Sequence, residues 1–467
     1  MKFGQWLPDL DPYGHDGLVT ARNVFPTAQG YGPVKAYSAI TGALPDTYKG
    51  GGAFRGVGGT TALLVGTDAG LYDYTSGWVL AGAGSYTNAW RFAQFGDLVI
   101  AVQGAAPLKY TIASTTAATL GGTPPNASMV AIASDFVVMS GVDSANSTVY
   151  WSGINDAESW TPGTAQSDTQ VLPDGGEVTG LAGGEYMLVF QREQIWRGQY
   201  VGPPFIFQFD KVARGIGCIA PGSIGQAGRT VYFISQRGFF SFTDGTISPI
   251  GASRVDSTFF SLYSVADIRA NISCTVDPYR KLVVWAMPDR LWIYNWELDR
   301  WSDVATTVFA VASGMTRSYT FDDIAALYPS GMETVPGSFD DPIWAGGEPF
   351  LLLAANDGTL GSFGSMSNLE AQLVTPYFEP IKGRDIRVRA ARIDTDATDD
   401  VVLSLDSKKQ LGGSVTASNS NVIRGNGDTP IRASGRYLQA GVTYEAGATW
   451  TYAQGLDLVG VSGGGVQ

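Results

Sequence analysis

The segment KLVVWAMPDRLWIYNWELDRWSD, from Lys281 to Asp303, concentrates tryptophans and a tyrosine in two short apolar runs. The turn residues between the runs indicate a β-hairpin buried on both faces. Trp292, Tyr294 and Trp296 alternate along the second strand, so their side chains share one face. Such a stripe either stacks on sugar rings in solvent or packs against neighbouring hairpins.

Six other stretches repeat this pattern, which favours packing over seven separate sugar sites. Apolar runs begin at Leu63, Leu98, Phe136, Met187, Val231, Leu282 and Leu351. In each case a second strand follows, with an aromatic residue at Tyr72, Tyr110, Trp151, Trp196, Phe240, Trp292 or Phe363. Spacing of about 40 to 50 residues in an all-β repeat is typical of propeller blades. We therefore expect an all-β fold, a β-propeller of six or seven blades, with the repeated aromatics packed between blades.

Composition and the pattern of apolar residues divide the chain into three parts. Residues 1–45 are punctuated by proline and glycine and predict an N-terminal extended arm. Residues 46–367 hold the repeats, with an insertion around 304–349. Residues 368–467 alternate apolar and polar positions and predict a C-terminal β-sandwich-like module.

Two short helical insertions are expected within the repeats. One begins near Ser253 and places Val255, Phe259, Leu262 and Val265 on one face. The other begins with Thr320 as N-cap and lies in the insertion.

Charge argues against a protein that grips nucleic acid or an anionic membrane. The chain of 467 residues carries 43 acidic and 30 basic residues, a net charge of −13. Sequence-independent binding to DNA requires many lysines and arginines. The densest basic stretch places Arg384, Arg387, Arg389 and Arg392 between apolar residues, which predicts a solvated strand face. No run of residues reaches the length of a membrane span, and we expect a soluble protein made in the cytoplasm.

Residues able to carry chemistry are few, and we expect no catalytic, cofactor-binding or metal-binding site. His15 is the one histidine of the sequence, and Cys218 and Cys274 are expected to be small buried residues. Carboxylates gather in two turn-like segments without the spacing of a calcium loop, at Asp9, Asp11 and Asp16 and at Asp394, Asp396, Asp399 and Asp400. A glycosidase needs only two carboxylates, and this alternative stays open.

Several stretches resemble structural proteins of tailed bacteriophages. They are WLPDLDPYGHDGLVTARNVFPTAQGYGPVKAYSAI (Trp6–Ile40), AWRFAQFGDLVIAVQG (Ala89–Gly104), VYWSGINDAESW (Val149–Trp160), SFDDPIWAGG (Ser338–Gly347) and RYLQAGVTYEAGATWTYAQGLDL (Arg436–Leu458). The order of RGIGCIAPGSIGQAGRTVYFISQRGFFSF, a helix and VDPYRKLVVWAMPDRLWIYN resembles the tail hub, or nozzle, of short-tailed phages, the packaged-DNA stabilisation protein.

The resemblance implies a non-enzymatic virion protein of the tail, assembled in the host cytoplasm. It implies a homohexameric ring below the portal and its adaptor that retains the packaged genome and guides its ejection. Genome DNA would pass without sequence-specific binding, and the acidic residues would either face that path or keep the outer surface soluble. Two alternatives are a receptor-binding or glycan-cleaving tail component and a bacterial propeller adaptor unrelated to phage.

Overall fold

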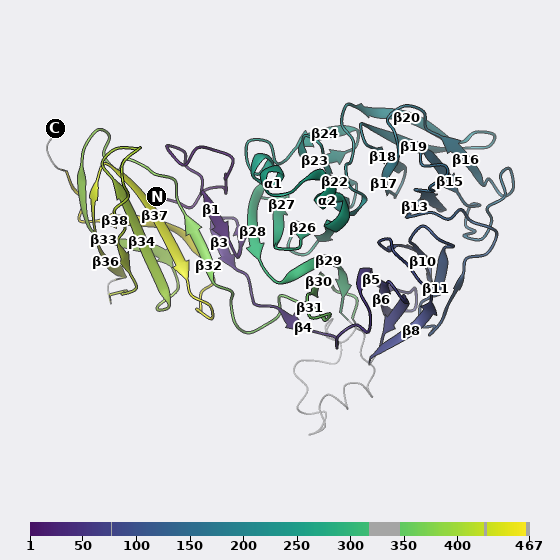
Figure 1. Ribbon diagram of the computed structural model, residues 1–467, viewed down its shortest axis with the longest axis horizontal. Coiled ribbons are helices and arrows are strands. Elements are labelled where there is room, and N and C mark those ends of the chain that lie inside the picture. Colours follow the sequence, from purple (N-terminus) through teal and green to yellow (C-terminus); the bar gives the residue numbers. More distant parts are fainter. Residues whose placement is uncertain (76, 317–345, 425–426, 464–467) are drawn as a thin grey trace, which may run out of the picture.

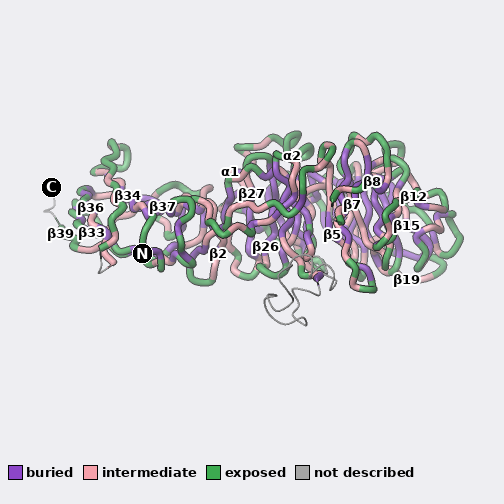
Figure 2. The backbone as a smooth tube through the Cα atoms, turned by 90° about the horizontal axis from the view of Figure 1, so that it is seen from below, coloured by how far each residue is buried: buried purple, intermediate pink, exposed green. Residues whose placement is uncertain are grey.

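The computed structural model describes residues 1–75, 77–316, 346–424 and 427–463, and almost all of its regular structure is β. Two bodies lie side by side along the long axis (Figure 1). One is a circle of small sheets around a common centre, and the other is a two-layered sandwich that holds both chain ends. Seen from below, buried residues fill the interior of both bodies (Figure 2).

The circle consists of seven four-stranded antiparallel units within the described residues. Unit one holds β5 (Tyr48–Arg55), β6 (Thr61–Thr67), β7 (Gly70–Tyr74) and β8 (Trp78–Ala83). Unit two holds β9 (Arg91–Phe95), β10 (Leu98–Val102), β11 (Leu108–Thr111) and β12 (Ala117–Thr119). Unit three holds β13 (Met129–Ala133), β14 (Phe136–Ser140), β15 (Thr148–Trp151) and β16 (Asp168–Val171).

The remaining units follow in chain order. Unit four holds β17 (Val178–Ala182), β18 (Met187–Gln191), β19 (Gln194–Gly202) and β20 (Ile206–Arg214). Unit five holds β21 (Gly225–Ala227), β22 (Thr230–Ser235), β23 (Gly238–Thr243) and β24 (Thr246–Pro249). Unit six holds β25 (Ser273–Asp277), β26 (Leu282–Met287), β27 (Arg290–Asn295) and β28 (Arg300–Ala305). Unit seven holds β29 (Val308–Met315), β30 (Pro349–Ala355), β31 (Leu360–Ser362) and β4 (Ser38–Ala39).

Every hairpin predicted from the sequence is present, and each occupies the same place in its unit. All seven apolar runs form the second strand, and all seven repeated aromatics lie in the third strand or directly after it. The second strands are buried on both faces; β14 and β26, for example, are buried at every position. Continuous apolar sequence is therefore explained by a strand that packs on both neighbouring units.

The circle closes through strand contacts and through one strand from the N-terminal region. First strands touch in succession from β5 to β9, β13 and β17, and from β21 to β25, β29 and back to β5. The 3₁₀ helix η1 (Pro221–Ser223) packs between β17 and β25. In unit seven β4 pairs with β31, with Ala39 opposite Gly361. The unit that ends the circle is thus completed by residues that precede the first unit in the chain.

The sandwich is continuous with unit six. The sheet of unit six extends from β28 through β1 (Thr20–Arg22), β32 (Ala371–Val374), β37 (Tyr437–Tyr444), β34 (Val401–Lys408) and β35 (Asn419–Ser420). The facing sheet holds β2 (Val24–Thr27), β3 (Gly30–Pro33), β38 (Ala453–Val459), β33 (Ile386–Thr395), β36 (Asp428–Gly435) and β39 (Ser462–Gly463). One hydrophobic core spans unit six and the sandwich and includes Trp285, Trp292 and Trp301.

The N-terminal region differs from the expected extended arm of residues 1–45. Its strands β1 to β4 are distributed over three sheets: β1, β3 and β4 each pair with strands from later in the chain, and β2 pairs with β3. The C-terminal module of residues 368–467 forms strands as expected, but β1, β2 and β3 complete it. The insertion is also narrower than 304–349, since β29 and β30 pair directly from Val308 to Met315.

The helical stretch near Ser253 consists of two short helices. They are α1 (Asp256–Leu262) and α2 (Val265–Asn271), and Ser264 begins the second with a capping box to Asp267. Val255 and Phe259 are buried as predicted, whereas Leu262 and Val265 are 49% and 39% exposed. Leu262 is the last residue of α1 and Val265 the first of α2, so the two short helices do not share the single apolar face that the sequence predicts. The helix predicted at Thr320 lies outside the described residues. No described helix is long and apolar enough to span a bilayer.

Candidate functional site

The aromatic stripe of the opening segment is a packing surface between units. Trp292 is fully buried and Tyr294 is 5% exposed. Tyr232 of unit five lies 6.1 Å, between ring centroids, from both Tyr294 and Trp296. The prediction of packing is confirmed, because buried rings are closed to a sugar.

A buried ion cluster joins the sandwich to the circle. β1 runs parallel to β28 with Arg22 opposite Asp303. Asp303 is 1% exposed and lies 3.4 Å from Arg22 Nε and 3.2 Å from Arg290 Nη1. Burial raises the pKa of the Asp303 carboxyl, while both arginines oppose the rise. Because one carboxylate serves a residue from each body, the cluster fixes the register at the joint.

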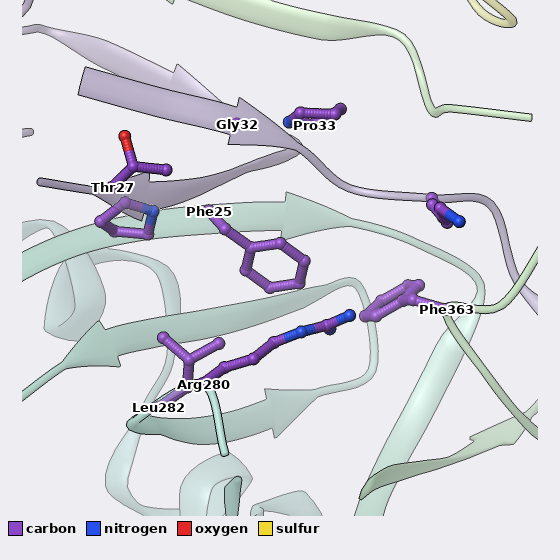
Figure 3. A pocket seen from close by; sticks show the side chains of 9 residues that line it. Phe25, Thr27, Gly32, Pro33, Arg280, Leu282 and Phe363 are labelled. Carbon is purple, nitrogen blue, oxygen red and sulfur yellow. The ribbon is translucent and has the colours of Figure 1, made fainter. Parts of the chain in front are cut away.

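A cavity lies beside this joint, where the N-terminal hairpin β2–β3 faces units six and seven (Figure 3). It measures about 370 Å³ and is lined by Phe25, Pro26, Thr27, Gly32, Pro33, Lys35, Arg280, Leu282 and Phe363. The guanidinium of Arg280 lies over the ring of Phe25, 5.1 Å from its centroid. The lining holds two cations and no acid, so it suits a narrow apolar group with a negative end.

A second cavity of about 260 Å³ shares Arg280 and Phe363 with the first. Tyr279, which is 83% exposed, and Glu348 also line it. Its other carboxylate, Asp277, is buried and accepts the backbone N–H groups of Tyr279 and Arg280, both at 3.0 Å. Asp277 is therefore committed to holding the turn between β25 and β26. The two cavities adjoin at Arg280 and Phe363, and we refer to the pair as the groove.

Acidic residues singled out in the sequence serve local structure. The Asp9 carboxylate accepts the N–H groups of Ser257 and Thr258, each at 2.8 Å, at the start of α1. Asp396 accepts from the N–H and hydroxyl of Thr451 at 2.8 and 2.6 Å. The structure does not draw the other carboxylates of either segment into a common site, since no group of three His, Cys, Asp or Glu within the described ranges could hold a metal ion.

The remaining candidates occupy ordinary structural positions. His15 accepts the N–H of Gly17 at 3.0 Å. Cys218 and Cys274 are free thiols, the first buried and the second half-buried, and burial raises the pKa of Cys218 to about 11. On β33, Arg387, Arg389 and Arg392 are exposed while the intervening side chains are buried, which confirms the predicted solvated strand face for these three. Arg384 is also exposed but lies before the strand.

The groove, the ion cluster and the closing strand β4 were not found from the sequence. Each unites residues more than 250 positions apart, such as Arg22 with Asp303 and Phe25 with Arg280. No local pattern marks such pairs.

Comparison with known proteins gives no family. No protein-family model matches the chain, and the curated proteins contain no match. Among solved structures, the extracellular domain of a hybrid two component system from B. thetaiotaomicron aligns with TM-score 0.44 and 9% identity, covering 89% of this chain and 47% of that one. BBS1N in complex with ARL6DN aligns with TM-score 0.42 and 12% identity, covering 70% and 95%. PorZ, a surface component of the type-IX secretion system of Porphyromonas gingivalis, aligns with TM-score 0.37 and 10% identity, covering 82% and 45%. The chain thus spans about half the length of the first of these, and likeness at this level carries no functional inference.

Proposed function

We propose that this chain is a structural subunit of a phage tail, a hub or nozzle protein that assembles as a homohexameric ring around the DNA exit channel. In this proposal the circle of units is a seven-bladed β-propeller in which β4 completes the last blade. The succession of first-strand contacts around the centre supports this assignment. The position of the protein within the tail is inferred from the segments of the sequence that resemble phage proteins.

The observation that carries the proposal is the single sheet shared by both bodies. Unit six and the sandwich are joined by hydrogen-bonded strands, with β1 between β28 and β32. A linker would let two domains rotate, whereas a continuous sheet with a buried ion cluster holds them at one angle. A subunit of fixed shape is what a closed ring of repeated contacts requires.

The partners follow from the same proposal. Portal and adaptor proteins would lie above the ring, and further tail proteins below it. Genome DNA would pass without sequence-specific binding, because the net charge of −13 opposes neutralisation of phosphates. The protein would reside in the virion tail after assembly in the host cytoplasm and would carry out no reaction.

Electron microscopy of the purified full chain tests the proposal. We expect ring-shaped particles of defined rotational symmetry, six-fold by the resemblance. A protein that stays monomeric at every concentration contradicts the proposal.

The groove supports one alternative, a receptor-binding or glycan-cleaving tail component. The half-buried Phe25 and the exposed Tyr279 offer aromatic surface to a sugar. Saturable binding or turnover within a panel of polysaccharides, lost on changing Tyr279 to alanine, favours this alternative.

A further inference from the structure

The facing sheet of the sandwich and unit three each carry a small surface patch of like charge, of opposite sign. Arg387, Arg389 and Arg432 are exposed on the outer side of the facing sheet of the sandwich, and we call them the arginine face. Val388 pairs with Ala433 on the core side, so the arginines beside them project from the same outer side. A β-bulge between Val388 and Ala390 sits at Arg389.

The arginine face is unpaired within the described part of the chain. Its neighbour Arg392 is bound by Asp428 at 2.8 Å, and Arg436 by Glu379 at 3.1 Å. No described carboxylate is within ion-pair distance of the three arginines of the face. Exposed Asp385 and Asp394 flank it on β33 or just before it. The arginine face is therefore a small basic patch that has no ion-pair partner among the described residues and is bordered by two aspartates.

The complementary surface lies on unit three. The sequence holds no lysine, arginine or histidine between Lys109 and Arg192. Within that stretch Glu158, Asp174, Glu177 and Glu185 pair with bases from outside it. Asp135, Asp156 and Asp168 are exposed and lack such a base among the described residues, and we call them the acidic rim. Asn155 donates its N–H to the Asp135 carbonyl at 2.9 Å, which brings two of the rim turns together.

Figure 1 places these surfaces at opposite ends of the long axis, with β33 and β36 at one end and β15 and β16 at the other. A contact between them cannot form within one chain. Two copies aligned end to end bring arginine face and acidic rim together while each keeps a free end. Such a contact is heterologous, so repeating it generates a closed ring or a filament.

We propose that the arginine face binds the acidic rim of a second copy of this chain, and that this contact builds the homo-oligomer. The inference rests on the proposed function and names the surfaces that meet in it. Complementary charge orients the two copies before contact and rejects pairing of like ends. Association should weaken with salt, because screening at physiological salt already acts over about 8 Å.

Charge reversal tests the contact in the full-length protein. The face variant carries Arg387→Glu, Arg389→Glu and Arg432→Glu. The rim variant carries Asp135→Asn, Asp156→Lys and Asp168→Lys; asparagine is chosen at Asp135 because its φ is 66°, a left-handed conformation that asparagine tolerates. A control with the same charge change as the face variant, at other exposed sites, carries Arg214→Glu, Arg237→Glu and Lys409→Glu.

Sedimentation velocity at about 50 mM and about 500 mM salt measures association. We expect wild type and control to associate at low salt, and each reversed variant to bind itself at least about tenfold more weakly. An equal mixture of face and rim variants should recover association, because each end again meets its opposite. Unchanged far-ultraviolet circular dichroism shows that the variants are folded.

The possible results separate this inference from the proposed function. Rings that persist in both variants overturn the contact and leave the ring standing. Self-association lost in both variants and recovered on mixing, without any ring in electron micrographs, supports the contact and contradicts the hub. A wild type that never associates overturns both. Binding of a short DNA duplex that the face variant alone loses, with self-association intact, assigns the arginines to nucleic acid and overturns the contact.

Discussion

The Asp256 carboxyl provides a stability prediction with a defined pH dependence. It lies at the first turn of α1, beneath the β22–β23 turn, where its Oδ1 accepts the N–H of Phe239 at 3.0 Å. Gly238 and Gly251 pack so closely that a Cβ on either would lie within about 2 Å of this carboxylate. Burial, with a contribution from the charge of Asp9, raises the pKa of Asp256 to about 6.

A raised pKa means that the folded protein binds this proton more tightly than the unfolded chain does. Its contribution to stability is therefore complete below about pH 4 and is lost as the pH rises to 6 and beyond. The shift from 3.8 to about 6 corresponds to at most about 3 kcal/mol. Because the carboxyl is partly exposed, solvent reduces this to about 1–2 kcal/mol.

Asp256→Asn keeps the acceptor oxygen and removes the charge. We expect the variant to match wild type near pH 4 and to gain about 1–2 kcal/mol in unfolding free energy at pH 7.5. Urea denaturation followed by tryptophan fluorescence at several pH values measures the difference. Asp11→Asn, at an exposed position nearby, should show no such trend. A variant that is less stable than wild type at pH 7.5, or a difference independent of pH, refutes the reasoning.

Three further predictions concern packing and the joint. Asp303→Ala removes the nearer carboxylate of half-buried Arg290, which keeps only Asp289 at 3.8 Å, and should cost about 1–3 kcal/mol of unfolding free energy in urea. Glu297→Ala, in an exposed pair with Lys281, should cost less than about 1 kcal/mol. Trp285→Ala empties a site that is 0% exposed and should cost about 3–5 kcal/mol, seen as a lower denaturant midpoint; an unchanged midpoint would contradict its place in the core. Gly66→Ala puts a Cβ 2.0 Å from the ring of Trp90 and should lower the unfolding free energy by about 1–3 kcal/mol, seen as a lower melting temperature. In the control Gly42→Ala, the new Cβ meets nothing within 4 Å, and the melting temperature should stay unchanged.

Local pattern was enough to find the strands of the circle. Leu282 and its six counterparts lie in second strands, because a continuous run of apolar residues in a strand is buried on both faces of the sheet. An aromatic residue recurs at equivalent positions, such as Tyr110 in unit two and Trp151 in unit three, because a buried side chain must fill the same space between neighbouring units each time. These signals span only a hairpin, so a sequence reveals them without knowledge of the fold.

The partners of the N-terminal strands escaped prediction for the opposite reason. β4 is two residues long, and Ser38 and Ala39 carry no periodicity that marks a strand. Their pairing with Ser362 and Gly361 depends on an edge that exists only after the circle has formed. The helical stretch failed in a related way, since Leu262 is apolar at helical spacing yet lies beyond the last buried contact of α1.

The N-terminal region therefore couples features that would otherwise be independent. Within residues 20–39 the chain contributes β1 to the shared sheet, β2 and β3 to the facing sheet and to the groove, and β4 to unit seven. Because only a few residues separate these strands, the pairing of β4 in unit seven also fixes the position of the sandwich relative to the circle. The arginine face and the acidic rim are thereby held at fixed positions at opposite ends of one body. An end-to-end contact between such bodies repeats with a constant angle at each step, and this constancy is what allows the last copy to meet the first.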